Sequence, residues 1–130
     1  MYQEGIVRFS TEKYNNKDLG NLFSHLTNTS INKHSQNAAQ MKHGYKWTIE
    51  QLKYYLTDKG VDFKLLWQRI ELIVMLTLIN LITLIPDLEC CMELFGFDVM
   101  IDQNAKPWLI EVNSAPAMSN DCAIDWQIKS

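Results

Sequence analysis

Residues 91–113, CMELFGFDVMIDQNAKPWLIEVN, contain the clearest structural pattern in the chain. Apolar residues dominate the part that ends at Ile101 and the part that begins at Pro107, and a short polar segment separates them. Two β-prone runs joined by a short polar segment are typical of an antiparallel hairpin. The sequence therefore predicts a strand over Cys91–Ile101, a turn over Asp102–Lys106 and a return strand over Pro107–Asn113.

Three oxygen-bearing side chains lie on this hairpin, namely Asp98, Glu111 and Asn113. Glu111 and Asn113 are two residues apart and share one face of their strand. If the turn is symmetric about Asn104 and Ala105, Asp98 lies opposite Glu111, with Cβ atoms about 4.5–5.5 Å apart. Two carboxylates at that separation repel each other, and a bound cation would remove the repulsion. Mg²⁺ prefers such oxygen ligands, so the spacing predicts a magnesium site. The alternative is an ordinary polar face exposed to solvent.

The first part of the chain predicts short elements. Gly5–Phe9 and Phe23–Thr27 are β-prone, and Asn28–Gly44 is polar and aperiodic, which predicts a long loop. A helix is expected from Thr48, because Thr48 and Gln51 have the spacing of a capping box. That helix should end at residues 58–60.

A long apolar helix is predicted over Asp62–Ile85, followed by Pro86. Its apolar residues lie nearly all round, so we expect a buried core helix with both sides covered. Polar residues interrupt the apolar run, which makes its uninterrupted pieces far shorter than the ~20 residues that span a bilayer. We therefore expect no membrane partner. A further helix could begin at Asp125–Lys129.

Size and composition predict one globular domain. The 130 residues are 47% hydrophobic and 21% charged, and the net charge of -3 gives no electrostatic reason to bind nucleic acid. The three cysteines, Cys90, Cys91 and Cys122, are too few for a disulfide framework. They indicate a reduced protein of the cytosolic type, with the cysteines serving in packing.

A few polar residues are candidates for ligand binding. Arg8 could pair with a phosphate or a carboxylate, although a surface arginine is the simpler interpretation. The residues at the end of the second predicted strand enter a polar loop, which is a common place for phosphate or metal contacts and equally a turn satisfied by its own side chains. A small basic cluster precedes Trp47 and could be merely solvated. The residues at the strand end are His25, Thr27 and Asn28. The basic cluster consists of Lys42, His43 and Lys46.

Five segments together resemble consecutive motifs of the tubulin tyrosine ligase-like family. One of them, Gly44–Thr48, is similar to the same stretch in the glutamylase branch of that family. The five segments are Glu4–Ser10 (EGIVRFS), His25–Lys33 (HLTNTSINK), Gly44–Thr48 (GYKWT), Glu93–Val99 (ELFGFDV) and Lys106–Pro116 (KPWLIEVNSAP). The resemblance covers nearly the whole chain in the family's order.

The resemblance implies an α+β fold, the C-terminal half of an ATP-grasp ligase domain, in which an antiparallel hairpin packs with helices. Residues 1–130 would be a partial catalytic domain, and the N-terminal lobe that grips adenine would lie before Met1. By the same resemblance, Asp98, Glu111 and Asn113 would hold Mg²⁺ against the phosphates of ATP.

Further roles are implied by the resemblance alone. ATP would be lined by a set of cofactor-binding residues: His25, Leu26, Thr27, Asn28 and Ile110. Arg8 and Glu111 would be catalytic. Arg8, Ser30 and Lys46 would hold the incoming amino acid.

The implied activity is ATP-dependent ligation of free L-glutamate to tubulin. The side-chain carboxylate of a tail glutamate would become an acyl phosphate, and the amine of free glutamate would form an isopeptide bond. The partners would be tubulin C-terminal tails and microtubules. The implied location is the cytoplasm and the microtubule cytoskeleton, with cilia or flagella included.

Other functions stay open at this point. A glycine or tyrosine ligase would share the fold. An inactive truncated protein, a microtubule-binding module and a small metal-binding domain are further alternatives. Because the adenine-gripping lobe would lie outside these residues, we expect the 130-residue chain alone to be inactive.

Overall fold

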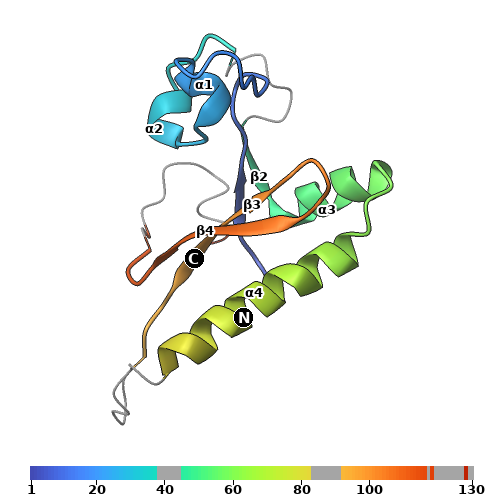
Figure 1. Cartoon of the computed structure of the whole chain (residues 1–130), viewed down its shortest axis with the longest axis vertical. Helices are drawn as coiled ribbons and strands as arrows, with labels where there is room; N and C mark the ends of the chain where they lie inside the picture. The colour runs from blue at the N-terminus through green and yellow to red at the C-terminus, as the bar shows by residue number, and fades with distance from the viewer. Residues whose placement is uncertain (38–44, 83–91, 117, 119–127, 129–130) are drawn as a thin grey trace. The chain divides into compact units, whose positions relative to one another are not determined.

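The computed structural model describes residues 1–37, 45–82, 92–116, 118 and 128 (Figure 1). Their helices and two antiparallel two-stranded sheets give the α+β class that the sequence predicts. The chain divides into two compact units, residues 2–55 with 119–130 and residues 56–118 with residue 1.

The first unit is organised by a short ribbon of two strands. β1 (Ile6–Arg8) pairs antiparallel with β2 (Lys46–Thr48). Aromatic rings pack beside the ribbon: the ring of Trp47 meets that of Phe9 at 4.7 Å and that of Tyr55 at 5.5 Å, both edge-on. Edge-on aromatic pairs stabilise by about 0.5–1.5 kcal/mol beyond the area they bury. This cluster holds the ribbon against the helix that follows it.

That helix, α3 (Ile49–Asp58), confirms the predicted capping box. The backbone N–H of Thr48 donates to Gln51 Oε1 at 2.9 Å, and the N–H of Gln51 donates to Thr48 Oγ1 at 3.2 Å. Each side chain thus satisfies a backbone donor that the first turn leaves open. Gly60, at φ +77°, follows the end of the helix. A left-handed glycine there is a common helix stop.

The strand predicted over Phe23–Thr27 is wrong, because this segment begins with a helical turn, α1 (Leu22–His25). The reason is local capping: Asn21 Oδ1 accepts from the N–H of Phe23 at 3.1 Å, and Ser24 Oγ donates to the carbonyl of Asn21 at 2.9 Å. The chain becomes extended only at Leu26. The β-prone residues therefore follow an N-cap that overrides their strand preference.

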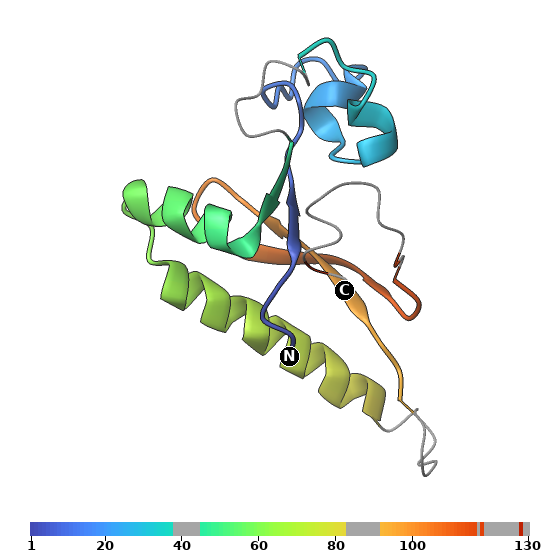
Figure 2. The ribbon, with the colours of Figure 1, turned by 180° about the vertical axis from the view of Figure 1, so that it is seen from behind.

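The long loop predicted over Asn28–Gly44 is also partly wrong. It contains α2 (Thr29–Asn32), a single helical turn. In Figures 1 and 2, α1 and α2 lie together at one end of the β1–β2 ribbon. Residues 38–44 of this predicted loop lie outside the described residues.

The second unit contains the predicted hairpin. β3 (Gly96–Ile101) pairs antiparallel with β4 (Pro107–Asn113). The first strand is shorter than the predicted Cys91–Ile101, because residues 92–95 form no strand. Gly96 begins the strand at a close approach, since a Cβ placed there would come within 2.9 Å of Pro116 Cβ.

The turn of the hairpin is built around Asp102. Its N–H donates to the carbonyl of Lys106 at 3.0 Å, and its carbonyl accepts from the N–H of Ala105 at 3.0 Å. Ala105 has φ +56°, a left-handed conformation that favours glycine or asparagine. The predicted turn over Asp102–Lys106 is confirmed.

The long helix, α4 (Phe63–Ile82), begins where the sequence places it. Asp62 Oδ1 accepts from the N–H of Leu65 at 3.0 Å and caps the first turn. α4 contacts β4 of the same unit and runs beside the hairpin in both views (Figures 1 and 2). The predicted continuation to Ile85 and Pro86 lies outside the described residues.

The prediction that α4 is a covered core helix is wrong for the part of the chain that the structure describes. Of its residues only Leu66 and Val74 are buried. A larger set of its apolar side chains is exposed by 44–68%: Leu65, Leu72, Met75, Leu76, Ile79 and Ile82. By length and composition alone α4 could cross a membrane, since an 18-residue stretch within its 20 residues has a mean hydropathy of 1.7. Core helices of soluble proteins meet the same criterion, so the expectation of no membrane partner stays a prediction.

Some predictions fall on residues outside the described ranges. They concern the cysteines Cys90, Cys91 and Cys122, the residues Lys42, His43 and Gly44, and the helix over Asp125–Lys129, of which only Ile128 is described.

Candidate functional site

The hairpin brings the two predicted metal carboxylates together. Asp98 and Glu111 are direct cross-strand partners. Close to the turn, however, the register differs from the predicted one. Paired residues such as Val99 and Leu109 lie equally far along the chain from Asn104, and not from the midpoint between Asn104 and Ala105. A β-bulge between Asp98 and Val99 shifts the register and leaves Ile110 as the extra residue on β4. The predicted cross-strand pairing of Asp98 with Glu111 is thus confirmed, although the symmetric turn assumed for it is wrong.

Asn113 belongs to the same cluster. Its Nδ2 donates to Glu111 Oε1 at 3.3 Å, and the two residues share a face of β4. Asp98, Glu111 and Asn113 are all exposed. This amide contact ties the third predicted ligand to the carboxylate pair.

These three residues suit a hard divalent cation. Two carboxylates and one amide supply oxygen donors, the ligand type that Mg²⁺ takes from proteins together with water and substrate phosphates. Among the described residues no group of three His, Cys, Asp or Glu is placed to hold a metal ion. The candidate site differs from such groups because its third donor is the amide of Asn113. Exposure leaves room for the water and phosphate ligands that Mg²⁺ needs.

Apolar side chains continue the same face of the hairpin toward the turn. Met100 and Trp108 are cross-strand partners with exposures of 56% and 48%. Ile110, the bulge residue beside Glu111, is 59% exposed. The face therefore combines a carboxylate cluster with apolar surface, a pairing that could contact both the charged and the flat parts of a nucleotide.

In the first unit, the ribbon brings together two of the predicted basic residues. Arg8 on β1 and Lys46 on β2 are direct cross-strand partners. Both side chains are cationic, which suits an anionic ligand. Arg8 offers a planar fork for a carboxylate and Lys46 a point charge.

Four of the predicted nucleotide residues follow one another from the last residue of α1, His25, to Asn28 just before α2. Leu26, Thr27 and Asn28 are exposed, and His25 is half-buried. The ring of His25 is held locally: its Nε2 lies 2.8 Å from the carbonyl oxygen of Asp18, and Tyr14 meets it edge-on at 5.2 Å. His25 is therefore anchored within its own unit, whereas the three residues after it present an exposed segment.

Ser30 lies on α2, and it is exposed. The predicted sites thus fall into three groups: the hairpin carboxylates in one unit, and the Arg8–Lys46 pair and the residue 25–30 segment in the other. Within each group, strand pairing, hydrogen bonds or a ring contact hold residues in place.

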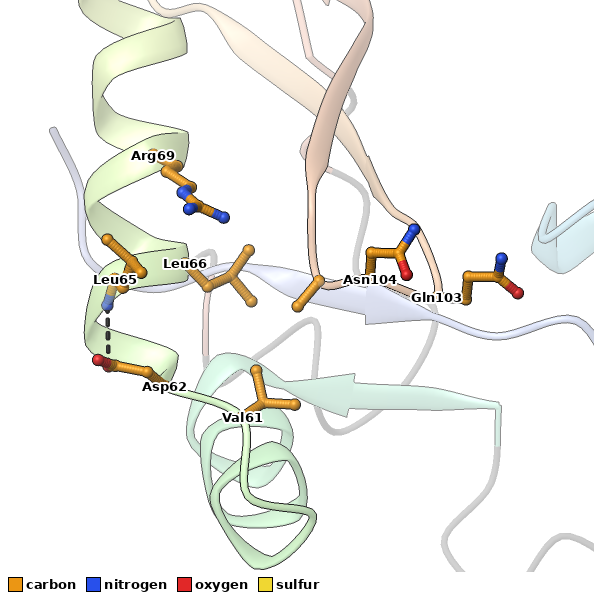
Figure 3. Close-up of a pocket in the computed structure, with 8 residues that line it drawn as sticks. Val61, Asp62, Leu65, Leu66, Arg69, Gln103 and Asn104 are labelled. Atoms are coloured by element: carbon orange, nitrogen blue, oxygen red, sulfur yellow. Dashed lines mark hydrogen bonds between the residues drawn. The ribbon is translucent and has the colours of Figure 1, made fainter.

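A pocket of about 370 Å³ lies between the start of α4 and the hairpin turn (Figure 3). Figure 3 shows Leu66 and Arg69 of α4 on one side and Gln103 and Asn104 of the turn on the other. None of the residues predicted from the sequence to bind ATP, metal or amino acid lines this pocket. It is therefore separate from the candidate site.

Asn32 is the residue that sequence reasoning missed. It is 0% exposed, and its side chain makes four hydrogen bonds in the first unit. It lies in the segment His25–Lys33, yet no local rule marks an asparagine as buried, because asparagine is usually exposed.

Comparison with known proteins identifies the family. The family model described as "Tubulin-tyrosine ligase family" matches residues 1–130. The chain is 46% identical over 133 residues to the probable tubulin polyglutamylase TTLL2 of Homo sapiens, covering 99% of this chain and 22% of that protein. It is 39% identical over 144 residues to the tubulin monoglutamylase TTLL4 of Homo sapiens, covering 99% of this chain and 12% of that protein.

A third relative is the tubulin polyglutamylase TTLL5 of Mus musculus, 36% identical over 146 residues, with 100% of this chain and 11% of that protein covered. The chain spans about a fifth or less of the length of these relatives. It belongs to the tubulin-tyrosine ligase family.

Proposed function

We propose that this chain is part of an ATP-dependent ligase that adds glutamate to tubulin. The observation that carries the proposal is the register of the hairpin, which sets Asp98 opposite Glu111 with Asn113 on the same face. Membership of the tubulin-tyrosine ligase family and the glutamylase names of its relatives support glutamate and tubulin as the substrates.

In this proposal the hairpin belongs to the C-terminal half of an ATP-grasp domain. Asp98, Glu111 and Asn113 would hold Mg²⁺, and the bound ion would supply positive charge for the phosphates of ATP. Ile110 lies beside Glu111 in the bulge and contacts the nucleotide through its exposed apolar side chain. Glu111 would be catalytic in the sense that its carboxylate would hold the ion that binds the phosphates.

The opposed cations of the ribbon have a different part. Arg8 and Lys46 hold carboxylates of the incoming glutamate, because the ribbon places these two cationic side chains opposite each other. Ser30 adds a hydroxyl donor to the same amino acid. His25, Leu26, Thr27 and Asn28 line the nucleotide.

The reaction proceeds in two balanced steps. A side-chain carboxylate of the tubulin tail attacks the γ-phosphorus of ATP, forming an acyl phosphate and releasing ADP. The amine of free glutamate then attacks the acyl carbon, and inorganic phosphate leaves with the electron pair of the broken C–O bond. The amine loses a proton and an isopeptide bond remains. Arg8 favours phosphoryl transfer by balancing negative charge, and the other residues position two anionic reactants.

The test is calorimetric titration of Mg·ATP into the chain and into a variant carrying Asp98→Asn and Glu111→Gln. The variant keeps the shape of both side chains and removes their charge. We expect Mg·ATP to bind the unaltered chain and to bind the variant at least about tenfold more weakly, because two charge-assisted contacts to the metal are lost.

The matched control carries Glu50→Gln and Asp58→Asn, two exposed carboxylates of α3. It removes the same charge elsewhere and should bind as the unaltered chain does. The proposed metal–nucleotide site on this hairpin would be contradicted if the Asp98/Glu111 variant bound Mg·ATP as tightly as the control variant does. It would also be contradicted if the folded, unaltered chain bound no Mg·ATP.

A further inference from the structure

We infer that Asn32 is a positioning residue that fixes the backbone of Leu26–Asn28 for nucleotide binding. The nucleotide part of this inference rests on the function proposed above. The hydrogen bonds that carry it stand independently, and all lie within the first unit.

The side chain of Asn32 is enclosed, and each of its polar atoms has partners. Nδ2 donates to the carbonyl of Leu26 at 2.7 Å and to the carbonyl of Asn28 at 3.1 Å. Oδ1 accepts from the N–H of Thr11 at 3.0 Å and from Thr11 Oγ1 at 2.8 Å. At 0% exposure, losing both partners of either atom would leave a buried polar group without a hydrogen bond.

The two donated bonds hold the peptide on both sides of Thr27. Leu26 has φ −113° and ψ 139°, and Asn28 has φ −60° and ψ 130°, so the segment is extended. It joins two helices of four residues each, α1 and α2. Helices that short are marginal by themselves. The amide of Asn32 therefore supplies order that the flanking helices do not.

The accepted bonds tie this segment to the chain that continues from β1. Thr11 is 8% exposed and follows Arg8, the last residue of β1, by a short connection. One buried side chain thus connects the predicted nucleotide segment with the strand that carries a predicted catalytic cation.

Asn32 is buried, whereas the residues that it holds are exposed. Leu26, Thr27 and Asn28 are exposed, and the side chain of Asn28 makes no capping bond to α2. A ligand can reach these three residues, whereas Asn32 touches only protein. Asn32 consequently acts through them, as a positioning residue does.

The experiment compares Asn32→Asp with Thr11→Val in the full chain. Asn32→Asp keeps size and shape but removes both donors to Leu26 and Asn28. Thr11→Val removes one bond to Oδ1 and leaves both donated bonds. Two readouts are taken: the affinity for Mg·ATP by calorimetry, and the backbone amide chemical shifts of residues 26–28 by NMR.

We expect Asn32→Asp to weaken Mg·ATP binding by about tenfold or more and to shift the amide signals of residues 26–28. Thr11→Val should stay within about threefold of the unaltered chain, because the donated bonds remain. Leu52→Ala serves as a stability control, since Leu52 is buried in α3 at 7% exposure and its side chain takes no part in the hydrogen bonds of Asn32. It should lower the melting temperature without changing the affinity of the folded protein.

The possible results separate the two ideas. If the folded Asn32→Asp variant keeps its affinity and its amide shifts at residues 26–28, the positioning role is overturned. If the amide shifts change while affinity does not, Asn32 orders the segment but not for nucleotide, which also overturns the inference. If the unaltered chain binds no Mg·ATP, the proposed function fails, and the NMR comparison still decides whether Asn32 orders the segment.

Discussion

At the residue scale, the carboxyl group of Asp102 has an ionisation that the folded chain perturbs. Its Oδ2 accepts from Trp108 Nε1 at 3.0 Å, and its Oδ1 accepts from the N–H groups of Asn104 at 2.8 Å and Lys106 at 3.0 Å. The hydrogen bond from Trp108, followed by that from Lys106, lowers the pKa of the Asp102 carboxyl below its ordinary value of 3.8. The folded hairpin therefore favours the ionised form.

This linkage predicts how the stability of the hairpin depends on pH. Because the pKa of Asp102 is lower in the folded chain, its contribution is present above the ordinary value of 3.8 and is lost as the pH falls through the folded pKa. Asp102→Asn should be less stable than the unaltered chain at about pH 6, and the difference should shrink below about pH 3.8. Urea unfolding followed across that range measures both.

Asp58→Asn is the matched control for this experiment. Asp58 is exposed, and its partner Lys59 lies 3.8 Å away with both side chains mostly in solvent. Exposed pairs of this kind contribute little. A difference between Asp102→Asn and the unaltered chain that stays constant down to about pH 2 would contradict the linkage.

At the element scale, α3 and α1 show when local signals suffice. The capping box of Thr48 and Gln51 lies at fixed spacing next to a periodic apolar pattern, and the helix forms where both predict it. Asn21 gives a cap signal as well, but the residues after it are β-prone and only one turn long. A single turn carries too little periodicity to outweigh strand preference in a sequence-based prediction.

The start of α4 offers a stability test of the second unit. Leu66 is 1% exposed, whereas its neighbour Leu65 is 44% exposed. Leu66→Ala should lower the free energy of unfolding by about 2–4 kcal/mol, through lost burial and the cavity left behind. Leu65→Ala makes the same chemical change on the exposed side and should cost less than about 1 kcal/mol.

Urea unfolding of the two variants, followed by circular dichroism, measures this comparison. Equal losses of stability would mean that Leu66 is no more enclosed in solution than Leu65. That result would contradict the packing of α4 against the hairpin that the structure shows.

At the scale of the whole molecule, the exposed apolar surface of α4 is the dominant feature. Two polar residues in the second half of the helix bond to its own backbone: Thr77 Oγ1 donates to the carbonyl of Ile73 at 2.8 Å, and Asn80 Nδ2 donates to the carbonyl of Leu76 at 2.8 Å. Side chains bonded in this way no longer require water. The surface is thereby more apolar than its composition indicates.

Large apolar surface of this kind favours association. We expect the 130-residue chain to associate with itself as its concentration rises, and we expect Leu76→Lys with Ile79→Lys to reduce that association, because both residues are more than half exposed on α4. Sedimentation velocity over a range of concentrations measures the change.

The control adds two lysines elsewhere. Leu19 and Tyr54 are 77% and 69% exposed and lie outside α4. Leu19→Lys with Tyr54→Lys alters the net charge equally, so a similar loss of association in both pairs would attribute the effect to charge rather than to α4.

Features formed by neighbouring residues were determined by the sequence itself. The turn at Asp102–Lys106, the return strand Pro107–Asn113 and the capping box of α3 need only contacts a few residues apart. The two-residue period of a strand likewise places Glu111 and Asn113 on one face whatever surrounds them. The motifs that identify the family are also visible without a structure.

Three other features required the tertiary structure. The bulge at Ile110 sets the register that opposes Asp98 to Glu111, the ribbon pairs Arg8 with Lys46, and Asn32 is buried against Thr11. Each depends on segments that meet across long stretches of chain or on which side chains the assembled unit encloses. Local preference carries no information on either, because pairing and burial are decided by the sum of contacts made when distant segments come together.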